Sequence, residues 1–216
     1  MNRNLIQQTE AFLQQTFADS PWLSQNPTDR AYRLEHSYRV ANLAGEIAAA
    51  EGYSITYAVI GGLLHDIAYC EEMPTRDDQR NHGRRSAAIA RPFLQQLGLP
   101  ADAVEEICYA IAIHVDDQAD FPWTRTAFSE VVGDADNLDR FDVYRIYETL
   151  QYQNFSALPL EEKRETVDRM LLRLAELRDM PLGSATAKHL WLQRLEFYST
   201  FYGKLQNQLQ RSCTID

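Results

Sequence analysis

Apolar residues recur every three or four positions along most of the chain, and no alternating pattern typical of a β-strand runs for any length. Between about residues 28 and 51, one face of the expected helix carries His36, Val40, Leu43 and Ile47. This spacing is typical of an amphipathic helix that packs on a core. The periodicity therefore predicts an all-α protein.

Turn and capping residues divide the chain into the expected helices. The first covers about residues 2–18, the second runs from Thr28 or Asp29 to Glu51, and Ser54 caps a third that includes residues 58–68. After a polar loop at 71–80, Asn81 is expected to cap a helix that closes near Gly98. Further helices begin at Ala101 and at Thr124 or Thr126, and three amphipathic segments follow around residues 146–150, 167–177 and 191–209. We expect a single domain over residues 1–216, with a core at 25–145 and a C-terminal helical extension at 146–216 packed on it.

The segment at residues 61–68, GGLLHDIA, is apolar enough to be buried except for its histidine and aspartate. Aspartate is almost never fully buried unless it is paired or bound to a metal. Two adjacent glycines are poor helix formers, and they indicate that another backbone approaches closely. We therefore predict that this segment is the central helix and that His65 and Asp66 bind metal.

Other polar residues also interrupt apolar helix faces. Together with the first pair they form the set His36, His65, Asp66, His114 and Asp136, with His82 opening a helix beside them. A single histidine on a helix is more often a hydrogen-bonded core or surface residue than a ligand. Four of the five histidines belong to this set, however, and His189 is the exception. Imidazoles and carboxylates from several helices of a bundle commonly form metal sites.

Three motifs carry a family resemblance: EHSYRV at residues 35–40, LLHDI at 63–67 and DADNLD at 134–139. They resemble the H…HD…D signature of the HD-domain superfamily of metal-dependent phosphohydrolases, over about residues 28–145. Two further histidines, in HG at 82–83 and IAIH at 111–114, are similar to those of subfamilies that hold two metals. The resemblance implies an HD-domain helical bundle with additional C-terminal helices.

The resemblance also implies a ligand set. The first metal would be held by His36, His65, Asp66 and Asp136, and in two-metal subfamilies Asp66 bridges to a second metal held by His82 and His114. His65 and Asp66 would be the catalytic pair. Asp134 is the other candidate for the last carboxylate. One or two divalent ions per chain are expected, and the sequence does not distinguish Mn, Fe, Co, Ni, Zn and Mg. The loop after His114 reads VDD, which departs from many relatives.

Several arginines are candidates for substrate binding. Arg39 lies one turn from His36 and either binds phosphate or pairs with a nearby glutamate. Arg84 and Arg85 would lie in the first turn of the helix capped by Asn81, where a docked anion would suit them, or they form surface ion pairs. Arg140, after the last ligand, is a further candidate, as is Arg145. Asp139, one turn beyond Asp136, is expected to orient a ligand histidine or an arginine.

Charge and composition limit the partners and the cellular location that we expect for this protein. The net charge of −10 disfavours a nucleic acid polymer but permits a small phosphorylated substrate. No apolar run is long enough for a membrane span, and the N-terminal residues do not match a secretory signal, so a cytoplasmic protein is expected. The three cysteines lack CxxC spacing, which argues against a zinc cluster or a disulfide framework. The aromatic C-terminal helices would form a homodimer interface, cover the substrate or pack on the core.

Three functions are compatible with the sequence. The leading hypothesis is a metal-dependent phosphohydrolase that acts on a nucleotide or another small phosphate ester through a metal-activated water. The alternatives, implied by other branches of the superfamily, are a di-iron oxygenase acting on a small polyol or phosphonate and a non-catalytic nucleotide-binding sensor. No serine or cysteine nucleophile motif and no glycine-rich phosphate loop is present in the sequence.

Overall fold

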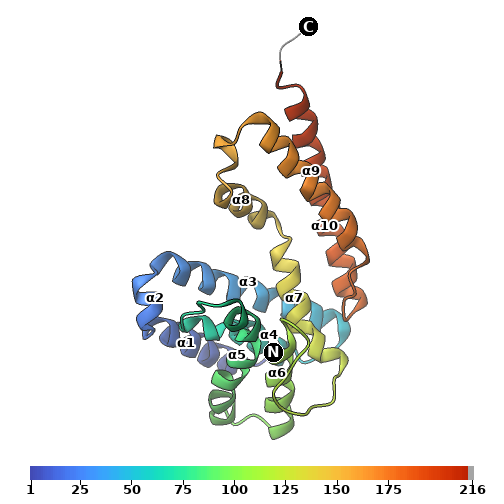
Figure 1. Cartoon of the computed structure of the whole chain (residues 1–216). Coiled ribbons are helices and arrows are strands. Elements are labelled where there is room, and N and C mark those ends of the chain that lie inside the picture. Colours follow the sequence, from blue (N-terminus) through green and yellow to red (C-terminus); the bar gives the residue numbers. More distant parts are fainter. Residues whose placement is uncertain (214–216) are drawn as a thin grey trace. The chain divides into compact units, whose positions relative to one another are not determined.

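The computed structural model describes residues 1–213, and these residues form helices and turns without a strand (Figure 1). The α-helices are α1 (Arg3–Ala18), α2 (Pro21–Gln25), α3 (Pro27–Glu51), α4 (Ile55–Leu64), α5 (Arg76–Gln96), α6 (Ala101–Ile113), α7 (Val131–Arg140), α8 (Val143–Tyr152), α9 (Leu160–Glu176) and α10 (Ala185–Gln210). Short 3₁₀ helices cover Ile67–Cys70, Ala127–Glu130, Phe155–Ala157 and Leu177–Asp179. The predicted all-α class is confirmed.

Two compact units make up the chain. The first comprises Met1–Asp139 together with Gly183–Ala187, and the second comprises Arg140–Leu182 and the described residues from Lys188 on. The boundary falls within the last turn of α7. All six residues expected to bind metal therefore belong to the first unit.

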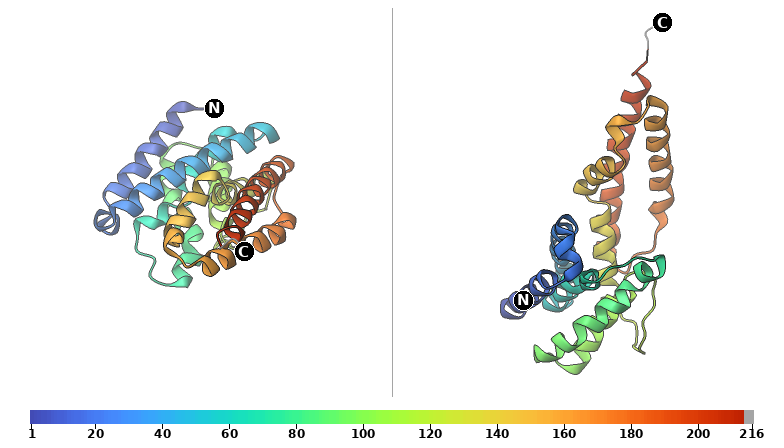
Figure 2. Two further views of the ribbon diagram at one scale, coloured as in Figure 1. Left: turned by 90° about the horizontal axis from the view of Figure 1, so that it is seen from above. Right: turned by 60° about the vertical axis from the view of Figure 1, so that its left-hand side comes forward.

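The first unit is organised around α4, which contacts α1, α3, α5 and α6. Helices α1, α3 and α4 lie side by side (Figure 2). A β-carbon added at Gly62 would lie 2.6 Å from the Cα atom of Ala41 on α3, and one at Gly61 would lie 2.9 Å from the side chain of Val132. The prediction that the glycine pair permits a close backbone approach is confirmed.

The start of α5 differs from the prediction. Thr75, not Asn81, caps this helix: the Thr75 hydroxyl accepts from the backbone N–H of Asp78, and the Asp78 carboxylate accepts from the backbone N–H of Thr75, both at 3.1 Å. Such a reciprocal capping box satisfies two N–H groups at once and outcompetes a single asparagine cap. The predicted loop at 71–80 is therefore wrong for residues 76–80. Arg84 and Arg85 lie well inside the helix, where the dipole argument for an anion does not apply.

The end of α4 also differs from the prediction. The helix stops at Leu64 instead of continuing to Ala68, and His65 is its C-cap. Asp66 adopts φ −106° and ψ 13°, between helical and extended geometry, before the 3₁₀ turn Ile67–Cys70. Because the backbone leaves α-helical geometry at Asp66, the side chains that follow Leu64 do not continue the faces of α4.

One short helix was not predicted, and one predicted helix is divided. α2 begins at Pro21, where the proline ring suits the first helical position, and the Ser20 hydroxyl accepts from the N–H of Leu23 at 3.0 Å. The helix expected from Thr124 or Thr126 through Val143 breaks at Phe141, so Val143 starts α8.

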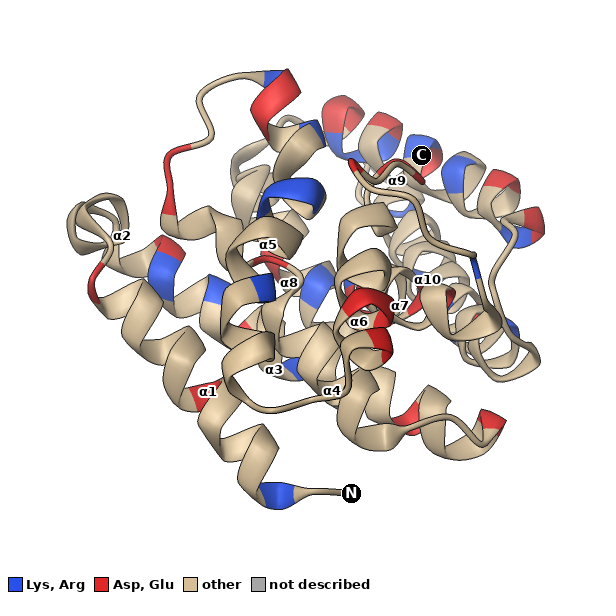
Figure 3. Cartoon of the chain, turned by 90° about the horizontal axis from the view of Figure 1, so that it is seen from below, with Lys and Arg blue, Asp and Glu red and all other residues tan. Residues whose placement is uncertain are grey.

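The second unit contains α8, α9 and most of α10. Trp191 on α10 is fully buried, its ring lies 4.8 Å from that of Phe141, and its indole N–H donates to the carbonyl of Leu177 at 2.9 Å. Acidic and basic residues are mixed along α9 (Figure 3). Arg164 forms an ion pair with Glu161, three residues earlier on this helix. Among the described residues, no helix has the length and apolar character needed to cross a membrane.

Candidate metal centre

Five elements of the first unit supply the six candidate ligands. His36 lies in the middle of α3, His65 and Asp66 follow α4, His82 lies on α5, His114 caps the C-terminus of α6, and Asp136 lies on α7. Five of them are at most 4% exposed, and the side chain of His114 is inaccessible. The convergence buries four imidazoles and two carboxylates in one place.

The first group of ligand atoms surrounds the Nε2 atom of His36. This atom lies 3.2 Å from Nε2 of His65, 3.2 Å from Oδ1 of Asp136 and 3.6 Å from Oδ2 of Asp66. Oδ1 of Asp66 lies 3.6 Å from Nε2 of His65. Atoms of His36, His65 and Asp66 are close enough together to hold a metal ion.

The second group surrounds Oδ1 of Asp66. Nε2 of His82 is 3.0 Å from Nε2 of His114 and 3.0 Å from Oδ1 of Asp66, and Nε2 of His114 is 3.8 Å from that oxygen. These three residues also form a cluster able to hold a metal ion. Asp66 is therefore common to both groups.

Hydrogen bonds at Nδ1 fix the orientation of all four imidazoles. The Nδ1 atoms of His65, His82 and His114 donate to the carbonyls of Gly62, Gln79 and Ile111, at 2.7, 2.5 and 2.7 Å. Nδ1 of His36 donates to Oδ2 of Asp139 at 2.7 Å. Because a carbonyl only accepts, the proton resides on Nδ1, and Nε2 of a neutral ring presents its lone pair to the centre of the site.

This arrangement fits a divalent metal. Burial lowers the pKa of His114 to about 3, so its Nε2 carries a lone pair that faces another imidazole at 3.0 Å. A cation placed between such nitrogens would remove their repulsion, and a donor set of imidazole and carboxylate suits first-row divalent ions. Each Nδ1 bond is of the kind that orients metal-binding histidines.

The charges of the site follow from burial and from neighbouring groups. Burial lowers the pKa of His65. Burial also opposes the charge on His36, but hydrogen bonds to Asp136 and Asp139 outweigh it and raise the pKa of His36 to about 9. Burial disfavours the charged form of Asp66, yet the surrounding imidazoles and Arg33 hold the pKa of its carboxyl well below the ordinary range.

Asp139 has the orienting position expected of it. Besides accepting from His36, its carboxylate accepts from Nε and Nη2 of Arg39 at 2.7 and 3.2 Å. Arg39 thus forms a two-point ion pair with Asp139. Asp134, by contrast, accepts the backbone N–H of Gly183 at 3.0 Å, and burial raises its pKa to about 7. The carboxylate that lies beside the histidines is that of Asp136.

Two of the other candidate arginines, Arg84 and Arg85, form ion pairs with acidic residues. Arg84 donates to Asp116 at 2.7 Å, and half-exposed Arg85 donates to Glu71 at 2.8 Å. Among the described residues, the ion pairs of Arg84 and Arg85 are with Asp116, Asp120 and Glu71, and none of these is one of the six candidate ligands. Arg140 is exposed at the end of α7 and belongs to the second unit.

Sequence reasoning missed Arg33 and Tyr69. Arg33 lies one turn before His36 on α3, and its Nη1 atom donates to Oδ2 of Asp66 at 2.9 Å. The guanidinium carbon lies 3.4 Å from the centre of the Tyr69 ring. Arg33 stands three residues before His36, so both lie on the same face of α3. This spacing could have identified Arg33 as a residue of the site. The position of Tyr69 depends on the 3₁₀ turn, which the sequence did not predict.

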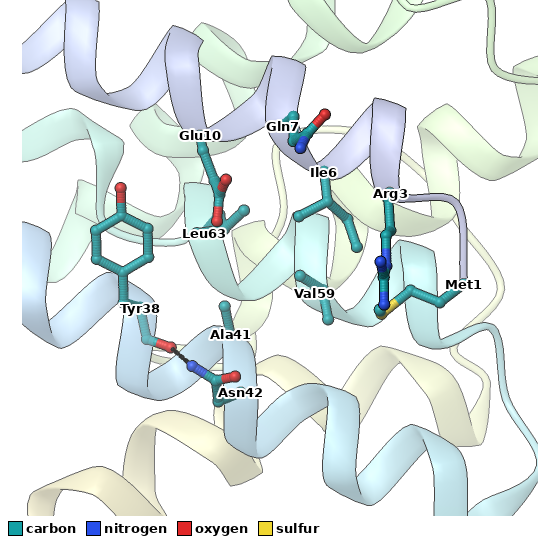
Figure 4. Close-up of a pocket in the computed structure, with 10 residues that line it drawn as sticks. All are labelled: Met1, Arg3, Ile6, Gln7, Glu10, Tyr38, Ala41, Asn42, Val59 and Leu63. Carbon is teal, nitrogen blue, oxygen red and sulfur yellow. Dashed lines mark hydrogen bonds between the residues drawn. The ribbon is translucent and has the colours of Figure 1, made fainter.

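A separate groove of the first unit, with a volume of about 220 Å³, is lined by α1, α3 and α4 and contains none of the six ligands (Figure 4). Apolar side chains of Ile6, Val59 and Leu63 line it, and Asn42 donates to the carbonyl of Tyr38 at 2.8 Å. This groove offers no cluster of metal-binding atoms among its lining residues.

Comparisons with known proteins agree with the geometry. The family model described as HD domain matches residues 33–144, more than half of the chain. A predicted HD superfamily hydrolase from an uncultured Thermotogales bacterium has a similar structure, with a TM-score of 0.64 and 23% identity, covering 95% of this chain and 91% of that one. The structure of Bacillus subtilis YpgQ in complex with ADP gives a TM-score of 0.59 and 18% identity, covering 95% of each chain. A comparison with curated protein sequences finds no match.

Proposed function

Since the chain belongs to the HD-domain family, we propose that it is a metal-dependent phosphohydrolase that acts on a nucleotide or another small phosphate ester. One observation carries the proposal: two pairs of imidazoles, each able to hold a metal ion, share a single buried carboxylate, that of Asp66. The proposed centre is binuclear, with Asp66 shared between the two ions.

The residues divide between two ions as follows. His36, His65 and Asp136 would hold the first ion with Asp66, and His82 and His114 would hold the second. Bound divalent ions lower the pKa of water and neutralise the charge that develops on a phosphoryl group. The chain contributes the geometry, because its Nδ1 hydrogen bonds fix every imidazole before any ligand arrives.

Charge favours an anionic substrate at this place. Two divalent ions carry more positive charge than Asp66 and Asp136 neutralise, so the loaded site would attract a phosphate group. Burial strengthens this attraction, since charges that water does not screen interact more strongly. No nucleophile from the chain is required for the proposed reaction.

The overall charge and one similar structure support a small substrate. The net charge of −10 repels a long polyanion but is compatible with a mononucleotide bound at a local positive centre. YpgQ of Bacillus subtilis, which shares the fold, has been crystallised with ADP. Nucleotides are therefore the first compounds to test.

The test measures phosphate and pyrophosphate release by protein loaded with Mn²⁺, under nitrogen, from a panel of nucleoside mono-, di- and triphosphates and phosphomonoesters. We expect turnover of at least one compound, its loss in His82→Ala and its retention in His189→Ala, a change at the exposed histidine outside the set. Absence of turnover across the panel would contradict the proposal.

The same assay separates the two alternative functions. A di-iron oxygenase would require iron and oxygen and would be inactive with Mn²⁺ under nitrogen. A nucleotide sensor would bind a nucleotide and return it unaltered. Turnover under nitrogen with Mn²⁺ excludes both for the substrate concerned.

A further inference from the structure

Arg33 contacts the carboxylate on which the proposed binuclear site depends. We propose that Arg33 is a positioning residue: by binding Oδ2 of Asp66 it fixes the plane of the carboxylate so that Oδ1 faces the second histidine pair, His82 and His114. The inference rests on the proposed function, because it assigns Arg33 a role toward the same two ions.

The two oxygens of Asp66 have different surroundings. Oδ2 accepts from Nη1 of Arg33 at 2.9 Å and lies 3.6 Å from Nε2 of His36. Oδ1 lies 3.0 Å from Nε2 of His82 and 3.6 Å from Nε2 of His65. Rotation of an aspartate carboxylate about its last bond is broad and weakly restricted, so a hydrogen bond to one oxygen sets the direction of both. Arg33 thereby determines which oxygen faces the second histidine pair.

Aromatic rings hold Arg33 in this position. Its guanidinium carbon lies 3.4 Å from the centre of the Tyr69 ring and 5.4 Å from that of Tyr32. The Tyr69 ring in turn lies 4.9 Å from the ring of His82. Because a planar guanidinium stacked on a ring loses little further freedom when it forms a hydrogen bond, the donor is preorganised. Through Tyr69, Arg33 is also linked to His82 of the second histidine pair, in addition to its hydrogen bond with Asp66.

Two arginines on α3 thus act on opposite sides of His36. Arg39, one turn after His36, pairs with Asp139, which binds Nδ1 of His36. Arg33, one turn before His36, pairs with Asp66. Each arginine reaches the proposed metals through a carboxylate, and the spacing R-x-x-H-x-x-R places both on the ligand face of the helix.

Charge and positioning predict opposite effects of removing Arg33, and this makes the role testable. If the guanidinium acted only as a positive charge near the metals, its removal would tighten metal binding. If it positions Asp66, its removal weakens binding, and loss of a group that orients a metal ligand typically reduces affinity by about 10–100-fold.

The experiment measures Mn²⁺ affinity by calorimetric titration of metal-free protein. Arg33→Met keeps an unbranched apolar side chain at this position but removes the donor, and Arg33→Lys keeps a donor. The matched control is Arg91→Met, because Arg91 also combines an ion pair, with Glu105, and a ring contact, 4.4 Å from the centre of Phe121. We expect about 10–100-fold weaker binding in Arg33→Met, an intermediate affinity in Arg33→Lys and wild-type affinity in Arg91→Met.

Unchanged or tighter Mn²⁺ binding in Arg33→Met would overturn the proposal, as would an equal loss in Arg91→Met. Kinetics of Arg33→Met with a substrate from the panel and saturating Mn²⁺ give a second readout. We expect a lower kcat and a KM within about twofold of the wild type. A raised KM together with normal kcat and normal Mn²⁺ affinity would contradict the positioning role and make Arg33 a substrate contact. If the wild type turns over nothing, the proposed function fails, and the titration still decides the role of Arg33 toward the metals.

Discussion

Replacing Gly62 by alanine tests the link between the central helix and the site. The added methyl group would lie 2.6 Å from Cα and 2.9 Å from the backbone nitrogen of Ala41. Ordinary contacts begin near 3.4 Å, and the obstruction is backbone rather than a flexible side chain. Helices α3 and α4 must therefore move apart by about 0.8 Å, the difference between 3.4 and 2.6 Å, which is a backbone shift of the kind that overpacking forces.

The expected cost follows from two opposing contributions. Overpacking of this kind costs about 3 kcal/mol when the neighbour is backbone, the upper end of the usual range. Alanine returns about 1 kcal/mol through its better helix propensity. The net loss of about 2 kcal/mol corresponds to a melting temperature lower by about 4–8 °C in a chain of this length.

Thermal unfolding followed by circular dichroism measures this loss, and Gly203→Ala is the matched control. A β-carbon at Gly203, inside α10, would meet nothing within 4 Å. This substitution should raise the free energy of unfolding by about 1 kcal/mol. Gly62→Ala should also weaken Mn²⁺ binding, because the carbonyl of Gly62 holds Nδ1 of His65. A Gly62→Ala protein as stable as the wild type would refute the close approach of the two backbones.

Three further predictions concern the site and its support. Asp139→Ala removes the acceptor that fixes His36 and should weaken Mn²⁺ binding about 10–100-fold in a calorimetric titration; unchanged affinity would contradict an orienting role. Mn²⁺ at about 100 times its Kd should stabilise the fold by about 2.7 kcal/mol in thermal unfolding, and a chelator should abolish the gain. Hydrogen bonds from the side chain and backbone of Thr186 lower the pKa of Glu51, so this carboxylate contributes stability above its unfolded pKa of about 4.3, and the contribution is lost as the pH falls through the lower folded pKa. Urea unfolding of Glu51→Gln should therefore show a larger destabilisation at pH 7 than at pH 4, and a pH-independent difference would argue against this linkage.

The sequence predicted the helices and their faces well, because amphipathic periodicity reports directly on burial. His36 was placed on the buried face of α3 by its spacing from Val40 and Ile47, and all three are buried. The adjacent glycines of α4 predicted a close backbone contact, since few other causes place two poor helix formers in a buried helix.

Boundaries were less predictable, because several residues compete for each cap. Asn81 is a good cap in isolation, but the reciprocal bonds of Thr75 and Asp78 satisfy more N–H groups and start α5 earlier. The stop of α4 at Leu64 was not predictable from periodicity, because the following residues remain apolar. That stop creates the 3₁₀ turn that brings Tyr69 to Arg33.

The partners of charged side chains could not be predicted from local sequence. Arg39 lies 4.0 Å from Glu35, one of the two glutamates within reach on its own helix, but its shorter hydrogen bonds go to Asp139, a hundred residues away in the chain. Arg33 was missed because its partner, Asp66, comes from another helix. Such pairings depend on how helices pack, which the sequence pattern determines only in outline.

The metal content of the purified protein tests the central claim most directly. Elemental analysis of protein loaded with excess Mn²⁺ and then freed of unbound ions should give two ions per chain, with one lost in His82→Ala and none in His189→Ala. One ion or none in the wild type would contradict the binuclear centre built around Asp66.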